Sequence, residues 1–258
     1  ALANVSSTVS DYAGVLGAAS FSGSATWTNV TVATALANVT STAGNYVGVL
    51  GAGSNRVSWT HVTVSAALAN VTSTASDYVG VLGVGSFSDT VTWTNVTVSA
   101  ALVNVMSTAS DCVGVLGAGS RGSVNWTSVT VSAALANVTS TARNYLSVLG
   151  AVSRGSVNWT NVTVSAALTN VTSTGGDVVG VLGTGSIVHL TAGNTATALW
   201  DEVAVVLVDS MLACRSVSVS GVLSASIATR DYSTGEMTTE GRVSWRGVVV
   251  VAAASGVS

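Results

Sequence analysis

Apolar and polar residues alternate along many short stretches of this chain. Val30 and Val32, for example, are separated by Thr31 and preceded by Asn29. A period of two residues carried by Val and Thr is typical of β-strands, and no apolar stripe with the helical period of about 3.6 residues is present. The pattern therefore predicts an all-β protein.

One phrase recurs along the chain with a nearly constant period. The string ALANVTSTASDYVGVLG, which starts at Ala67 as printed, has close copies that begin at Ala1, Ala35, Ala101, Ala134 and Ala167. Tryptophan follows the same rhythm at intervals of 32 to 34 residues, at Trp27, Trp59, Trp93, Trp126 and Trp159. Repeats of this length are typical of solenoids and other stacked arrays.

The last part of the chain keeps this rhythm in a degenerate form. The string RVSWRGVVVVAAA near its end matches RVSWTHVTVSAA in an early repeat, and insertions lie near Ile187–Thr195 and Thr229–Thr239. We predict about seven units in a single β-solenoid domain over 1–258, regular over 1–186 and degenerate over 187–258. The sequence starts in phase with the repeat and without Met, as a mature product or a fragment would.

Turn-forming residues recur at fixed places inside each unit. One column of such residues is Asp11, Asn45, Asp77, Asp111, Asn144 and Asp177. A second column is glycine, at Gly51, Gly83, Gly117 and Gly150. Asx and Gly residues tolerate the positive φ of chain corners, and the string SAALAN offers a third corner. Three strands and three corners in about 33 residues describe one coil of a parallel β-solenoid, whose coils bury their apolar faces by stacking.

A column of asparagines is predicted to form a structural ladder. It consists of Asn4, Asn38, Asn70, Asn104, Asn137 and Asn170. Asparagine persists beside Met106, where the N-x-S/T sequon is lost. Adjacent coils stack about 4.8 Å apart, which is too close for a glycan on every rung. We expect these side chains to pair with one another or with corner backbone.

Other sequons are candidates for N-glycosylation, because their positions vary as exposed positions do. The column that contains Asn29 has His61 and Ser128 in other repeats. The candidate acceptors are Asn29, Asn95, Asn125, Asn158 and Asn161. Their use would indicate a secreted protein.

The tryptophan column has two interpretations. In an ideal strand Trp27 lies on the same side as Asn29, while Val30 lies on the opposite side. If the valines point inward, the tryptophans form an exposed stripe for binding or assembly, at Trp27, Trp59, Trp93, Trp126 and Trp159. In the alternative, each ring lies beneath a neighbouring loop or corner.

The three-strand coil, the asparagine column and the valine-rich interior resemble the right-handed parallel β-helix, the pectin-lyase-like architecture. The Val, Thr, Ser and Asn content also resembles large β-helical surface proteins of flagellate protozoa. These resemblances imply an extracellular or cell-surface location. The Thr-x-Thr pairs that recur in the ALANVTST phrase, such as Thr72 and Thr74, resemble the flat threonine arrays of β-helical ice-binding proteins.

Composition narrows the possible functions. Only 7% of the residues are charged, against about 25% in an ordinary soluble domain. The net charge is −3 and no basic run is present, so nucleic-acid binding is not expected. No apolar run of about 18 residues predicts a transmembrane helix. His61 and His189 have no nucleophile or metal-ligand spacing around them, so we expect no catalytic residues, metal or cofactor.

We therefore predict a non-enzymatic structural or adhesive protein of the cell surface or extracellular space. Its partners would be further copies of itself, joined head to tail or laterally in a fibre, or other surface proteins and glycans. One alternative is a solenoid that binds a saccharide or ice. Another is a polysaccharide-acting β-helix enzyme, since acids and arginines gather in the last part of the chain.

Overall fold

We describe the protein from a computed structural model. The residues whose structure is described are 2–3, 6–7, 12–41, 46–74, 78–108, 112–141, 145–153, 156–173, 178–189, 196–208, 211–214, 219–230, 237–238, 241–253 and 256–257. Within them the regular structure is entirely β. The strands are β1 (Leu2–Ala3), β2 (Ser6–Ser7), β3 (Tyr12–Thr28), β4 (Thr31–Ser41), β5 (Tyr46–Ser73), β6 (Tyr78–Ser107), β7 (Cys112–Ser140), β8 (Tyr145–Ser153), β9 (Val157–Ser173), β10 (Val178–His189), β11 (Ala196–Val208), β12 (Met211–Cys214), β13 (Val219–Arg230), β14 (Met237–Thr238), β15 (Gly241–Arg246), β16 (Val249–Ala253) and β17 (Gly256–Val257).

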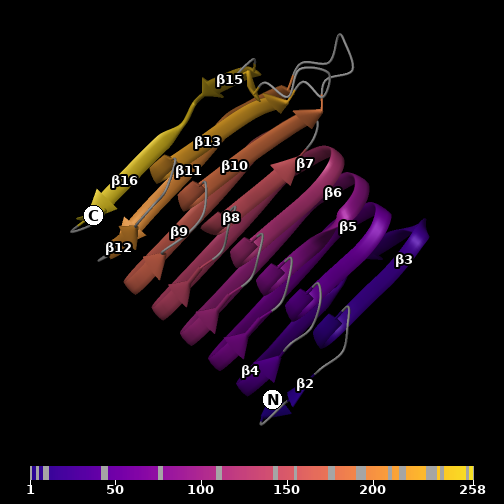
Figure 1. Cartoon of the computed structure of the whole chain (residues 1–258), viewed down its shortest axis with the longest axis vertical. Helices are drawn as coiled ribbons and strands as arrows, with labels where there is room; N and C mark the ends of the chain where they lie inside the picture. Colours follow the sequence, from indigo (N-terminus) through magenta and orange to yellow (C-terminus); the bar gives the residue numbers. More distant parts are fainter. Residues whose placement is uncertain are drawn as a thin grey trace.

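The strands form a parallel β-solenoid, as the sequence predicts. Each strand pairs in parallel with the strand one repeat further along the chain, and the described exception is the short antiparallel pair of β13 and β14. Figure 1 shows the strands side by side in sequence order, with β3 and β16 at opposite ends of the stack. The register joins identical repeat positions, so that residues at equivalent positions lie in columns along the stack.

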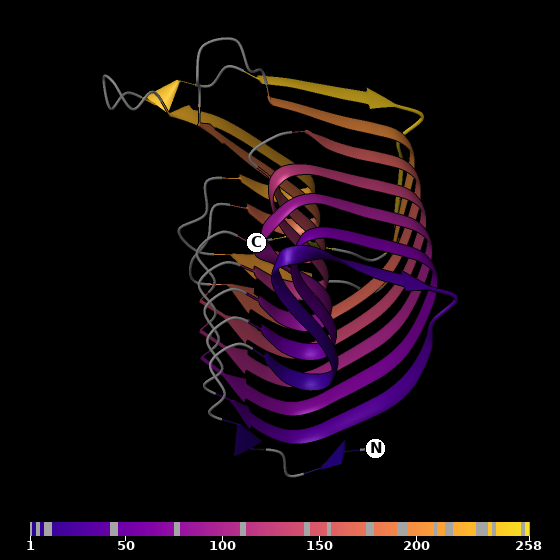
Figure 2. The ribbon, with the colours of Figure 1, turned by 90° about the vertical axis from the view of Figure 1, so that its right-hand side faces the viewer.

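The coil differs from the prediction in its count and its division into three strands. About three turns are regular in the central part of the solenoid, where we expected about seven coils. There β5, β6 and β7 run as single strands of 28, 30 and 29 residues that bend around most of a coil (Figure 2). The strands continue through two of the corners, where only the corner residue itself is left out of the pairing register, which is why three separate strands are not seen.

The corners are made by left-handed residues at two places in each coil. One column has φ near +53° and contains the asparagines of the predicted ladder, Asn38, Asn70, Asn104, Asn137 and Asn170. The other column lies two residues after the tryptophan and contains Asn29, His61, Asn95, Ser128, Asn161, Glu202 and Gly247. Asn and Gly accept this conformation at low cost, whereas other residues pay for it in backbone strain.

The register between coils is irregular directly after the predicted glycine corners, between Ala52 and Arg56 and between Val84 and Ser88. Gly51, Gly83, Gly117 and Gly150 are buried within strands and have no positive φ. The corner column that begins at Asp11 lies outside the described residues. The corner predicted in the SAALAN string is confirmed, because Asn70 at its end is left-handed.

The core is a set of valine, leucine and tryptophan columns. Val62, Val96, Val129 and Val162 are fully buried, as predicted for this column, and Val30 at its end is half-buried. A second column of valines, from Val64 to Val205, is also buried. Each core residue therefore packs against the equivalent residue of the coil above and of the coil below.

We predict that Val96→Ala lowers the free energy of unfolding by about 2 kcal/mol, because it removes buried methyl groups and leaves a cavity. Thr97→Ala is the matched control, since Thr97 is the exposed neighbour in the same strand, and its effect should stay within about 0.5 kcal/mol. Urea denaturation followed by circular dichroism measures both. Equal effects of the two substitutions would contradict the assigned core face.

Candidate functional site

The tryptophan column is an internal stack and not the exposed stripe that one interpretation predicted. Trp59, Trp93, Trp126 and Trp159 are fully buried in their own chain, and Trp27 at the end of the column is half-buried. Neighbouring rings lie nearly parallel, with centroid distances of 4.6 to 5.5 Å from Trp27 through Trp200. These central tryptophans therefore cannot contact a partner or a saccharide.

The tryptophans point inward, opposite to the side that strict alternation predicts, and the reason is local. The left-handed residue at His61 turns the chain between Trp59 and Val62, so both side chains point inward although their positions are three apart in the sequence. Strict alternation continues only on each side of this corner. Alternation between inward and outward side chains is therefore reversed across His61, because this residue is not extended.

The stack is stable despite unpaired donors. The indole Nε1 atoms of Trp59, Trp93, Trp126 and Trp159 are buried without a hydrogen-bond acceptor among the described residues. Each such donor costs about 1–3 kcal/mol. Aromatic pairing adds about 0.5–1.5 kcal/mol per contact beyond the burial of a large ring, and most rings here have two such contacts. Ring stacking and burial thus offset the missing hydrogen bonds.

The asparagine ladder forms as predicted. The side-chain Nδ2 of Asn70 donates to Oδ1 of Asn38 at 3.0 Å, and the same bond repeats from Asn104 to Asn70 at 2.9 Å. Asn137 and Asn170 continue the ladder at 3.0 and 3.1 Å. Asn4 lies outside the described residues. The side chains are exposed. The ladder satisfies the hydrogen-bonding groups of the amides, and the same asparagines adopt the left-handed backbone of the corner.

The second corner column holds most of the candidate glycosylation sites. Asn29, Asn95 and Asn161 are exposed and alternate along the stack with His61 and Ser128. Asn95 Nδ2 lies 3.1 Å from His61 Nε2, and Asn161 donates to Ser128 Oγ at 3.3 Å.

The two remaining candidates, Asn125 and Asn158, are half-buried and hydrogen-bonded to each other at 2.9 Å. They are the less accessible acceptors. The use of any of these sequons stays a prediction.

A hydroxyl-bearing face follows the second corner column. In each central coil an exposed threonine is followed two residues later by serine, as in Thr97 and Ser99. The serines continue into an open groove of about 520 Å³, lined by Thr34, Ser65, Ala66, Ala67, Ser99, Ala100, Ala101, Ser132, Ala133, Ala134, Ser165, Ala166 and Ala167. Sequence analysis missed this face, although the repeated string VTVSAA carries it.

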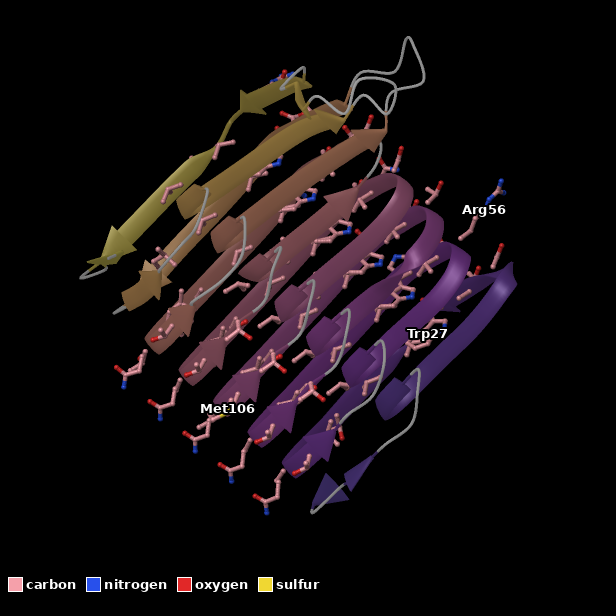
Figure 3. The ribbon with its side chains drawn as sticks, in the orientation of Figure 1. Trp27, Arg56 and Met106 are labelled. Atoms are coloured by element: carbon pink, nitrogen blue, oxygen red, sulfur yellow. The ribbon has the colours of Figure 1, made fainter. Side chains whose placement is uncertain are left out.

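The predicted Thr-x-Thr array is only partly regular. Thr72, Thr74, Thr139 and Thr141 are exposed in their coils. Met106 takes the place of threonine in the coil between them, and its side chain is 58% exposed (Figure 3).

Charged residues are few on the described surface. Arg56 is exposed and projects away from the ribbon in Figure 3. Arg246 Nε lies 3.6 Å from Asp201 Oδ1 near the other end of the stack. The described residues contain no group of three His, Cys, Asp or Glu side chains that could hold a metal ion, and no helix there is long and apolar enough to cross a membrane.

The two ends of the core columns are under-buried. Val164 and Val205 are 0% exposed, whereas Val250, the next residue in the column, is 42% exposed on β16. At the opposite end Trp27 and Val30 are half-buried, although their equivalents in central coils are fully buried. The under-burial at the N-terminal end is confined to part of the rung, because Val32, which is in the column of Val250, is only 7% exposed.

No family model, curated protein or solved structure matches this chain. Its function is therefore argued from the geometry of the columns and of their ends.

We predict that Asn104→Ala destabilises the protein by about 1–2 kcal/mol more than Asn104→Gly. Both variants remove the ladder amide, but only alanine is strained at the left-handed φ of 54°. Chemical denaturation of the two variants beside the unmodified chain measures the difference. If the two variants were equally stable, residue 104 would not need a left-handed conformation.

Proposed function

We propose that the protein is a non-enzymatic structural solenoid of the cell surface or extracellular space, which associates end to end. The observation that carries this proposal is the exposed rung at Val249, Val250 and Val251, which are 55%, 42% and 52% exposed. In the strand before it, Val205 of the same column is fully buried. A free sheet edge with consecutive apolar residues favours pairing with another strand.

The two ends are complementary in their residue pattern. At the N-terminal end of the described stack, β3 and the first residues of β4 pair on one side only, with β5. At the other end β15 and β16 pair on one side only, with β11. Both edges carry the same segment of the repeat, from Trp27 to Ala35 at one end and from Trp245 to Ala253 at the other. Each edge could therefore pair with the other as successive coils do.

Such a contact is heterologous and does not close on itself. Each added copy presents a new free end, so the expected product is a filament and not a closed dimer. The tryptophan column would continue from copy to copy, whereas the asparagine column ends at Asn170 and is followed by Met211 and Gly256. The resemblance of the repeat to β-helical surface proteins, and to the pectin-lyase-like architecture, agrees with a rod-like extracellular role.

We predict that the chain associates in a concentration-dependent manner at micromolar concentration, and that Val250→Arg strongly reduces this association. A charge on the terminal rung opposes both strand pairing and apolar contact. Val103→Arg is the matched control, because Val103 is 37% exposed in a central coil and adds the same charge away from the ends. Sedimentation velocity measures the mass distribution. Unchanged association of Val250→Arg would refute the assigned interface.

Ligand binding is a second candidate, favoured by the regular hydroxyl face and its groove. Threonine and serine repeat there at the coil spacing of about 4.8 Å, a geometry that suits a periodic solid or polymer such as ice or a polysaccharide.

We predict that, if this face binds ice, a solution of the protein freezes below its melting point and that Thr97→Tyr abolishes the gap. Thr127→Tyr, which is exposed on the segment before the corner at Ser128, should leave it unchanged because it lies outside both the hydroxyl face and the Thr-x-Thr array. Nanolitre osmometry measures the gap. The absence of any gap in the unmodified chain would exclude ice as the ligand.

A further inference from the structure

The outer face of the solenoid carries exposed valines that an end-to-end contact does not cover. Val250 belongs to the inward core column of Val205. Its neighbours Val249 and Val251 alternate with it, so they point outward, and they are 55% and 52% exposed. A further coil at this end would cover Val250 but would leave Val249 and Val251 on the outer surface. Exposed apolar side chains that lie together are typical of a surface that contacts another protein.

These two valines continue the hydroxyl face. Val249 and Val251 lie in the columns that contain Thr163 and Ser165, and the threonine column runs on through the central coils to Thr31. The described residues of both columns carry no charge. Charged residues are depleted in the core of protein interfaces in the same way. The whole face therefore has the composition of a contact surface, with an apolar part at one end.

A ridge and a groove run along the stack on the two sides of the threonine column. Around Thr97, the ridge is formed by the exposed left-handed corner residues His61 and Asn95. The groove is lined by small residues such as Ser99 and Ala101. Asn95 Nδ2 already pairs with His61 Nε2 at 3.1 Å, so this part of the ridge can enter a neutral groove without losing its hydrogen bond.

A single two-fold axis places the ridge of one copy in the groove of another. The axis runs parallel to the stack beside the threonine column, and because Asn95 and Ser99 are equally far from Thr97 in the strand, it exchanges ridge and groove between two facing copies. Such a contact is isologous and closes with two copies. Equivalent coils of the two copies then lie at equal heights, so valine meets valine at one end and threonine meets threonine in the central coils.

A second copy of the chain also supplies the area that a stable contact needs. The column from Thr31 to Val249 has seven rungs, which cover about 34 Å along the stack, and three outward columns cover about 20 Å across it. The face therefore measures about 700 Å² per copy, close to the roughly 800 Å² per partner of a typical specific interface. Its coil spacing matches that of the first copy at every rung.

We propose that the hydroxyl face pairs with the same face of a second copy, so that two solenoids lie side by side with their stacks parallel. This pairing does not require the end-to-end association. Where both contacts form, the product is a fibre of two solenoids in width, because each paired face is fully used. The pairing excludes a ligand on the same face, and a glycan on the ridge, for example at Asn95, would prevent it.

Charge at the two-fold axis tests this pairing. Thr130 is exposed in a central coil and faces the partner's Thr130 across the axis. All variants carry Val250→Arg, which opposes end-to-end association and points away from the outer face. This background should form dimers at micromolar concentration. Adding Thr130→Arg or Thr130→Glu should raise the dissociation constant of the dimer at least about tenfold, because like charges then meet. Sedimentation velocity over a concentration series measures it.

An equimolar mixture of the Thr130→Arg and Thr130→Glu variants should recover the dimer, because opposite charges then meet across the axis. A loss of folding could not produce this recovery. Thr139→Arg in the same background is the matched control. Thr139 is exposed in the same strand, beyond the corner at Asn137, so its substitution should leave the dimer unchanged. Far-UV circular dichroism shows that each variant keeps the solenoid.

The outcomes separate this inference from the proposed function. If the unmodified chain forms long assemblies and the folded Val250→Arg chain is a monomer, the paired face is wrong and end-to-end association stands. If both chains form only dimers that Thr130→Arg disrupts, the paired face stands and end-to-end association is wrong. Dimers that ignore Thr130→Arg, or a mixture without recovery, would overturn the paired face. A Val250→Arg monomer that freezes below its melting point would assign the face to ice instead.

Discussion

Self-stacking is the constraint on which this structure depends. In a parallel, in-register solenoid every residue lies about 4.8 Å from the same residue of the next coil, so each position must tolerate contact with itself. Tryptophan does so by ring stacking and asparagine by amide hydrogen bonds. Valine and leucine do so by close packing in the core. Charge does not, which accounts for a charged content of only 7%.

The corners follow from the same constraint. Asn and Gly can adopt a left-handed backbone, and a column of asparagines also forms its own hydrogen-bond ladder, so one residue type serves both the turn and the stack. Ser128 and Glu202 adopt the same φ without these advantages. They show that the corner is imposed by the coil and not by the residue, since the neighbouring rungs hold the backbone in place.

The ends of the stack are where the constraint is not met. Inside the solenoid each apolar side chain is covered by its equivalents on both sides, but Val250 and Trp27 have a described neighbour on one side only. The exposed apolar residues of β16 are thus a consequence of the repeat itself. A partner that carries the same columns would complete them, and a second copy of the chain has those columns in the required order.

Much of this architecture could be predicted from the sequence. The constant repeat and the period-two valines were sufficient to infer a parallel β-solenoid with a buried column through Val96, because stacking is the one way for such units to bury their apolar faces. The asparagine ladder was also predictable, since asparagine persisted at Asn104 where the sequon was lost. These inferences needed only the identity of residues at equal positions in the repeat.

The tertiary structure decided which side of the sheet the tryptophans occupy, where the corners lie and which edges are left open. Trp93 points inward because Asn95 is left-handed, and the sequence does not distinguish a left-handed asparagine from an extended one. The glycines Gly51 and Gly83 are buried in strands, and the register irregularities lie in the residues that follow them. The one-sided pairing of β16 is visible only in the register, because it depends on which strands meet in space and not on what the residues are.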